Sequence, residues 1–231
     1  MKLYFKTIIV FICLLFCNQV FAKEIESTTY IIEVGKINIG ILNWQASTLN
    51  NKYEVKIWLK DKGFISGLYR FKGEYSSEGS VEGGVFLPLV YNQFWSTKKK
   101  ERVIKIDFDD NLLKKLTVLP EEKEPARVSY HGIENYTDPL TSFLKIIRGE
   151  RIAKTIDGRR MYKMVVEEIK KSEDTLIKKI LIKNYINIWA DHNKNDLNYI
   201  EVYQGSDEKN ELMPEIIKIK FKGVVFSLSK N

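Results

Sequence analysis

The chain has 231 residues, 44% of them hydrophobic, and a formal net charge of +7. This length is enough for one domain to bury a core without crosslinks. Both cysteines, Cys13 and Cys17, lie close to the N-terminus, in a segment that we expect to be removed, so disulfides and thiolate metal sites are excluded from the mature form. Lipidation of Cys17 is disfavoured because the bulky Phe16 precedes it.

Residues 1–22 have the pattern of a signal peptide. Two lysines open the segment, Thr7–Phe16 is almost entirely apolar, and Val20–Ala22 places small residues at the two positions that a signal peptidase reads. The apolar run is shorter than the roughly 20 residues of a membrane-spanning helix. We therefore predict cleavage after Ala22 and a single β-rich periplasmic domain over residues 23–231.

Alternation of apolar and polar residues dominates the rest of the chain. It is clear in residues 37–41, 53–60 and 217–222, with Trp58 as an exception on the polar side. Side chains of a strand point alternately to its two faces, so these segments predict strands with one buried face. Asp157-Gly158 separates two such runs and predicts a hairpin.

One helix is predicted after residue 137. Asp138 suits the N-cap, Pro139 the first helical position, and Gly149 the C-cap region. The spacing i, i+3, i+4, i+7 gives the helix one apolar face, made of Leu140, Phe143, Leu144 and Ile147. A helix this short is unstable alone and must dock on the sheet. Strands in series with one helix predict a mostly β, α+β fold.

No catalytic, metal or cofactor site is predicted. The two histidines, His131 and His192, lie in different segments, and a zinc site needs three or four ligands. The polar tract 191–196 begins like a calcium loop, but Asp196 occupies the position that requires glycine. An enzyme is therefore the weakest reading. It would require acidic groups to converge on a histidine, and the pairs to examine are His131 with Asp138 and His192 with Asp191.

Several motifs occur in a characteristic order along the chain. They are Gly67–Tyr69, Ile106–Phe108, Asp138–Leu144, Asp157–Tyr162, Ile188–Asp191 and Tyr199–Val202. The most specific part is an Asp-Pro-Leu helix followed by an Asp-Gly-Arg hairpin. In these motifs the chain resembles a family of exported bacterial proteins, domain of unknown function 3108. The resemblance implies a periplasmic protein built on a curved antiparallel sheet, similar to the half-barrels that carry lipoproteins and lipids. It implies no catalytic residue.

We predict that the protein binds an amphipathic or lipid-like envelope component in an apolar groove between helix and sheet. The helix would contribute its apolar face, and the wall would be formed by Trp44, Trp58, Phe64 and Tyr69. The alternative is a monomeric envelope-maintenance protein that contacts another protein through a sheet edge. A packed interior without a ligand-sized cavity would favour the alternative. Nucleic acid is not an expected partner, and the positive excess, spread along the sequence, fits either anionic headgroups or ordinary solvated lysines.

Overall fold

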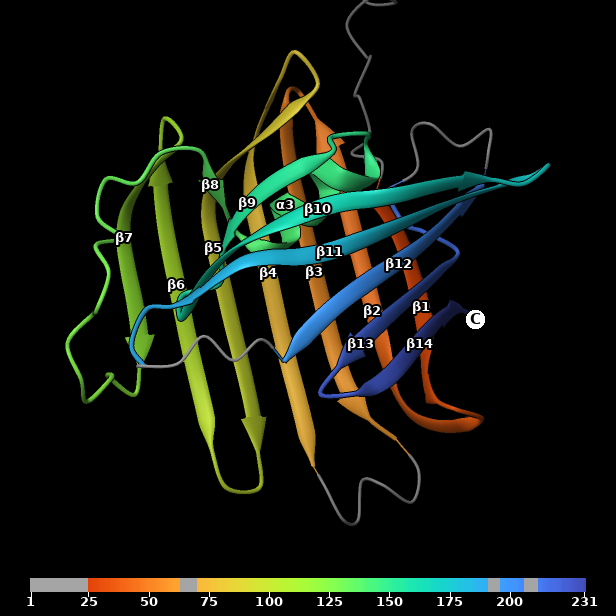
Figure 1. Ribbon diagram of the computed structural model, residues 1–231, viewed down its shortest axis with the longest axis horizontal. Coiled ribbons are helices and arrows are strands. Elements are labelled where there is room, and N and C mark those ends of the chain that lie inside the picture. Colours follow the sequence, from red (N-terminus) through yellow and green to blue (C-terminus); the bar gives the residue numbers. More distant parts are fainter. Residues whose placement is uncertain (1–24, 63–69, 191–195, 206–211) are drawn as a thin grey trace, which may run out of the picture.

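The computed structural model describes residues 25–62, 70–190, 196–205 and 212–231, and most of these lie in one large sheet (Figure 1). The elements in chain order are β1 (Ile25–Val34), β2 (Ile37–Leu49), β3 (Lys52–Asp61), β4 (Phe71–Glu82), β5 (Val85–Thr97), β6 (Glu101–Asp109), β7 (Leu112–Leu119), β8 (Tyr136–Thr137), α3 (Pro139–Ile147), β9 (Ile152–Ile156), β10 (Arg160–Lys171), β11 (Thr175–Asn187), β12 (Leu197–Gly205), β13 (Ile216–Phe221) and β14 (Val224–Lys230).

The sheet has 14 strands in the order β7-β6-β5-β4-β3-β2-β1-β14-β13-β12-β11-β10-β9-β8. Its pairs are antiparallel except for the short β8–β9 pair. Strands β1–β7 form one wall, and the sheet continues through β14 to form a second wall that crosses over the first (Figure 1). The predicted mostly β fold, with a curved antiparallel sheet and one covering helix, is confirmed.

The two ends of the sheet nearly meet. A bridge joins Leu112, at the start of β7, to Glu134, which lies just before β8. The Asn135 amide donates to the Asn111 carbonyl oxygen at 3.1 Å, and the Leu113 amide donates to the Ile133 carbonyl oxygen at 3.2 Å. The sheet is therefore closer to a closed barrel than the half-barrel that the sequence predicts.

Helix α3 lies inside this barrel, between the two walls (Figure 1). It begins at the predicted N-cap, Asp138, and Pro139 occupies the first turn. The C-cap is Arg148, and Gly149 follows it with a φ of 117°, a value that favours glycine. Within the described ranges, no helix has the length and apolar content needed to cross a membrane.

Two clusters of buried side chains fill the interior. The larger contains the apolar face of α3 together with residues from both walls, among them Tyr30, Val55, Ile180 and Val202. The smaller lies between β5–β7 and the β9–β10 hairpin, around Ile106 and Ile156. The alternation seen in the sequence thus places the apolar side of the strands inward, as predicted.

Candidate functional site

The helix residues predicted to line a groove are core residues. Leu144 is fully buried, Ile147 is buried, and Phe143 is 8% exposed. The Phe143 ring packs against the indole of Trp44 on β2, with 5.7 Å between ring centroids. Leu140, partly buried, packs against both apolar clusters. The structure therefore brings Trp44 and the four helix residues together, in a packed interior.

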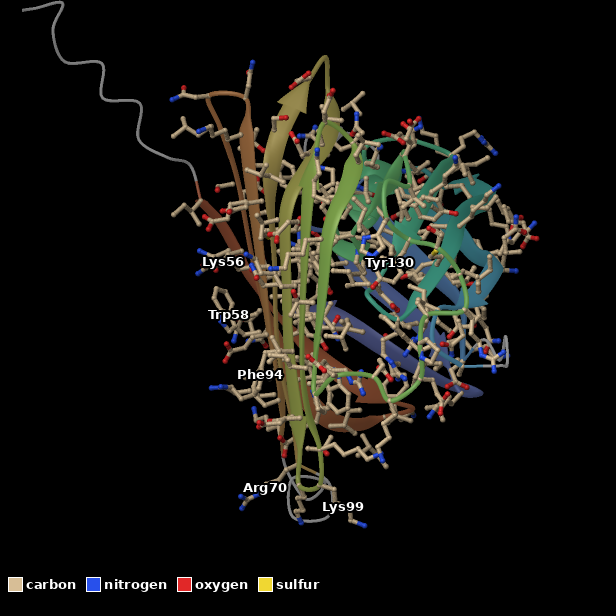
Figure 2. All side chains as sticks on the ribbon, turned by 90° about the vertical axis from the view of Figure 1, so that its left-hand side faces the viewer. Lys56, Trp58, Arg70, Phe94, Lys99 and Tyr130 are labelled. Atoms are coloured by element: carbon tan, nitrogen blue, oxygen red, sulfur yellow. The ribbon has the colours of Figure 1, made fainter. Side chains whose placement is uncertain are left out.

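The other predicted wall residues do not join this set. Trp58 pairs across the strands with Asn43, whereas Trp44 pairs with Ile57. Directly opposed residues share one face of a sheet, so Trp58 points away from Trp44 and out of the barrel. Figure 2 shows the Trp58 side chain on the outer surface. Phe64 and Tyr69 lie outside the described residues.

A buried carboxylate fixes the start of the helix. Asp138 is fully buried, and its Oδ1 accepts from the backbone amides of Leu140 at 2.9 Å and Thr141 at 3.0 Å. Its Oδ2 accepts from the Thr141 hydroxyl at 2.5 Å and from the Ser77 hydroxyl of β4 at 2.9 Å. Burial raises the pKa of Asp138, while these donors oppose the rise.

Hydroxyl groups extend this network to the walls. Tyr53 on β3 lies 2.6 Å from the Thr141 hydroxyl, and burial raises the pKa of its phenol. On the other side, Ser142 Oγ lies 2.6 Å from the Thr137 hydroxyl and accepts from Thr155 of β9 at 2.8 Å. All these groups are buried and partnered, as buried polar groups must be to avoid a large desolvation cost. The network therefore ties the helix to both walls.

A lysine fixes the other end of the helix. Lys178 on β11 is only 5% exposed, and its ammonium donates to the carbonyl oxygens of Ile146 at 3.1 Å and Ile147 at 2.6 Å. These oxygens belong to the negative end of the helix, which favours a cation. Burial lowers the pKa of Lys178 to about 8. The helix is thus held by a carboxylate at its N-terminus and by an ammonium at its C-terminus.

The polar groups inside the barrel are arranged for support of the helix. Asp138 is enclosed, whereas His131 lies exposed in a loop with its ring 4.4 Å from that of Tyr130, so these two residues, which the enzyme hypothesis would have paired, do not converge on one pocket. His192 and Asp191 lie outside the described residues. Among the residues that the structure describes, no group of three or more histidine, cysteine or acidic side chains could hold a metal ion.

The outer face of the first wall carries a shallow hollow of about 270 Å³. Trp58 on β3 and Phe94 on β5 flank it, both partly exposed, and both point outward in Figure 2. Across the strands Trp58 pairs with Glu74, Glu74 with Phe94, and Phe94 with Val103. An apolar row interrupted by one carboxylate therefore crosses this face.

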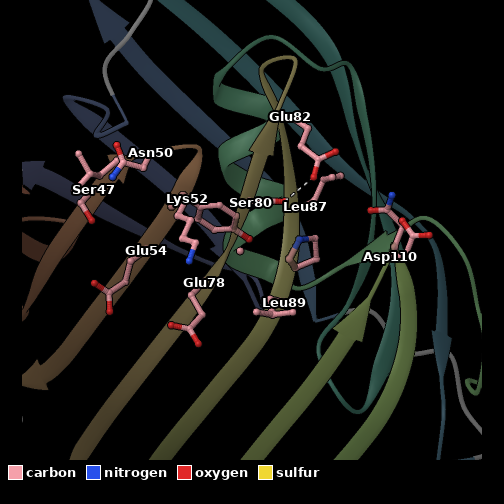
Figure 3. A pocket seen from close by; sticks show the side chains of 15 residues that line it. Ser47, Asn50, Lys52, Glu54, Glu78, Ser80, Glu82, Leu87, Leu89 and Asp110 are labelled. Carbon is pink, nitrogen blue, oxygen red and sulfur yellow. Dashed lines mark hydrogen bonds between the residues drawn. The ribbon is translucent and has the colours of Figure 1, made fainter. Parts of the chain in front are cut away.

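A larger cleft of about 820 Å³ lies where β2–β5 approach the β6–β7 turn (Figure 3). Its charged lining is mainly acidic, with Glu54, Glu78, Glu82, Asp110 and the single cation Lys52. The backbone here is bulged, because the β4–β5 register shifts between Glu78 and Gly79. The cleft is open and borders the packed interior, because the buried Tyr53 is among the residues that line it.

Sequence reasoning missed Lys178 and the hydroxyl network. Lys178 lies in the run Thr175–Lys183, where two further lysines make any one of them look like a solvent-facing residue. Ser77, Thr141 and Thr155 carry no spacing that distinguishes them from surface residues. The Asp-Pro-Leu-Thr motif is the part of the sequence that could have indicated the network, because the same Asp138 both caps the helix and accepts hydrogen bonds from the hydroxyls.

Comparisons with known proteins agree with this architecture. No family model and no curated protein matches the chain. Among solved structures, it is similar to a beta-barrel-like protein of domain of unknown function DUF1849 from Brucella abortus, with a TM-score of 0.54 and 9% sequence identity. The likeness covers 89% of this chain and 94% of that chain. At this identity the likeness shows a shared barrel-like fold alone.

Proposed function

We propose that the protein is an exported, non-enzymatic binding module of the bacterial cell envelope that meets its partner through its outer surface. In this proposal residues 1–22 are the signal peptide, the domain acts as a periplasmic monomer, and the barrel interior is structural. The resemblance to domain of unknown function 3108 supports the export and the envelope setting. This choice gives preference to the protein-contact alternative over the lipid-carrier hypothesis.

The burial of helix α3 is the observation that supports this choice most. The residues expected to line a lipid groove are in contact with both walls, and Leu144 and Ile146 have no exposed surface. A ligand pocket is normally a largely preformed cavity of about 300–1,000 Å³. To create one between the helix and the sheet, the helix would have to leave the barrel. That movement would break the contacts of Asp138 and Lys178 and expose an apolar core.

The chemistry of the described polar groups also favours a non-enzymatic role. Catalytic sites usually place titratable groups where a substrate can reach them, with a base within hydrogen-bond reach of a nucleophile. Here two of the groups with raised pKa values, Asp138 and Tyr53, are buried and bonded to each other through Thr141. Their pKa shifts follow from burial in a structural network. These observations support surface binding as the activity that we propose for this domain.

The test is mass spectrometry of organic extracts from protein purified without detergent from the bacterium that produces it. We expect no stoichiometric lipid or acyl species. Phe143→Leu, which keeps the interior apolar, serves as the control for Leu144→Asn, which places an amide in it. A lipid recovered from the wild type and the control, and lost from a folded Leu144→Asn protein, would overturn the proposal and restore the carrier hypothesis.

A further inference from the structure

The fold gathers lysines that are far apart in the sequence at one end of the barrel. In the registers of β1–β6, Gly40 pairs with Asp61, Lys60 with Lys72, and Ser96 with Glu101. The β1–β2, β3–β4 and β5–β6 connections therefore lie at the same end of the sheet. The β13–β14 connection lies there too, because Val34 at the end of β1 pairs with Phe226 near the start of β14. The exposed basic residues of these turns, here called the basic rim, are Lys36, Lys60, Lys62, Arg70, Lys98, Lys99, Lys100 and Lys222.

The acidic residues in the described parts of these turns are few. Asp61 and Glu101 lie within them, and Asp196 lies 3.6 Å from the Lys222 ammonium. The loop after β7 also carries the exposed Glu121 and Glu124, and its Glu122 is paired with Arg102 and with Arg159, the latter at 2.7 Å. The opposite end of the same strands has the contrary sign, since it carries the acidic cleft. The barrel is therefore electrically polarised along its strands.

Exposed aliphatic side chains lie among these cations. Ile37 in the β1–β2 turn is 64% exposed, and Val224 and Val225 beside Lys222 are 39% and 38% exposed. Leu119, at the same end of β7, is also exposed. Apolar contact and attraction to anionic headgroups are the two components of binding at a bilayer interface. Both components are present at this end.

We propose that the basic rim docks the protein on the surface of an anionic phospholipid bilayer. The charges sit in or beside separate turns, and Figure 2 shows Arg70 and Lys99 together at the lower end of the wall. Charges spread over several turns at one end suit the plane of a headgroup layer better than an extended acidic peptide, which needs a groove. This inference rests on the envelope setting of the proposed function and adds to it a membrane contact, with the acidic cleft facing away from the membrane.

Vesicle flotation tests the docking. The processed protein is mixed with vesicles of phosphatidylcholine containing about one third phosphatidylglycerol, at about 0.1 M salt. The test variant is Lys98→Gln/Lys99→Gln/Lys100→Gln. A matched control neutralises three lysines at or toward the acidic end, Lys52→Gln/Lys114→Gln/Lys115→Gln. Pure phosphatidylcholine vesicles report any binding that does not depend on headgroup charge.

We expect the wild type and the matched control to float with anionic vesicles alone. Each lysine near an anionic surface is worth about 1 kcal/mol, so the test variant should bind about 100-fold more weakly. Equal losses in the two variants, or no flotation of the wild type, would overturn the docking. Binding to soluble polyglutamate without flotation would assign the rim to an acidic macromolecule instead. These failures leave the proposed function standing, whereas a stoichiometric lipid that is lost from folded Leu144→Asn protein removes the proposed function whatever the vesicles show.

Discussion

Replacement of Asp138 by alanine tests how the helix is held in the barrel. The carboxylate accepts four hydrogen bonds, two from backbone amides of α3 and two from the hydroxyls of Thr141 and Ser77. It has no exposed surface. Its removal leaves the first turn of the helix uncapped and takes from two buried hydroxyls their charged acceptor. Water cannot replace that acceptor without entering the core.

The expected loss follows from these four bonds. Removal of an N-cap side chain costs about 1 kcal/mol. Each buried hydroxyl that loses its acceptor adds about 1–2 kcal/mol, at the low end of the usual range. The low end applies because Ser77 Oγ and Thr141 Oγ1 lie 2.9 Å apart and can bond to each other. Asp138→Ala should therefore lower the free energy of unfolding by about 3–5 kcal/mol.

Urea unfolding followed by circular dichroism measures this loss. Asp138→Asn retains a side-chain carbonyl for the two amides and should cost about 1–2 kcal/mol. Asp174→Ala, in the exposed β10–β11 turn, is the matched control and should cost less than about 0.5 kcal/mol. A loss below about 1 kcal/mol for Asp138→Ala would refute the reasoning, because it would mean that the network does not hold the helix.

The pH dependence of stability provides a second readout of the same residue. The folded pKa of Asp138 lies above that of the unfolded chain, 3.8, because burial disfavours the charged form. The folded protein then binds the extra proton, so this group's contribution to stability is present at low pH. It is lost as the pH rises through the folded pKa. Asp138→Asn should remove this dependence.

Three further predictions concern other sites. Gly79→Ala should lower the free energy of unfolding, measured by thermal unfolding, by at least about 2 kcal/mol, because the new Cβ would lie 2.0 Å from the backbone oxygen of Leu87. A loss near zero would show that the bulge can relax to make room for the methyl group. The free energy of unfolding should rise between pH 8 and 10.5 in the wild type but not in Lys178→Met, because the unfolded chain binds the proton that buried Lys178 gives up near pH 8. Phe143→Ala should lower the free energy of unfolding by about 3–5 kcal/mol and Trp58→Ala by less than about 1 kcal/mol, because Phe143 lies in the core and Trp58 on the outer face. Equal losses in the two variants would contradict these placements.

The fold could be predicted because its signals are local. Alternation in β3 and β13 reflects one buried face, and Asp138, Pro139 and Gly149 delimit the helix by rules that act within a few residues. Near-closure of the sheet could not be predicted. It depends on the bridge between Leu112 and Glu134, which joins segments with no shared pattern.

The candidate site was harder to predict because its properties arise from the topology. An apolar helix face is compatible with a ligand groove or with a core, and only the enclosing second wall decides between them. Lysines that look evenly spread along the sequence, such as Lys36, Lys99 and Lys222, become neighbours of one rim when antiparallel strands return to the same end. The alternation in β3 places Trp58 on the polar side of the strand, which predicts that its side chain points outward. Its large apolar side chain nevertheless favoured the prediction that it lines the groove.

Hydrogen exchange of the α3 amides, measured in the folded protein, tests the central claim most directly. If the helix is a fixed part of the core, the amides of Phe143–Ile147 should open only with the whole domain, and their exchange should be within about tenfold of the slowest strand amides. Exchange as fast as that of the exposed turns, in a protein whose strands remain protected, would contradict the account. It would show that the helix leaves the barrel readily and that the interior is accessible to a ligand.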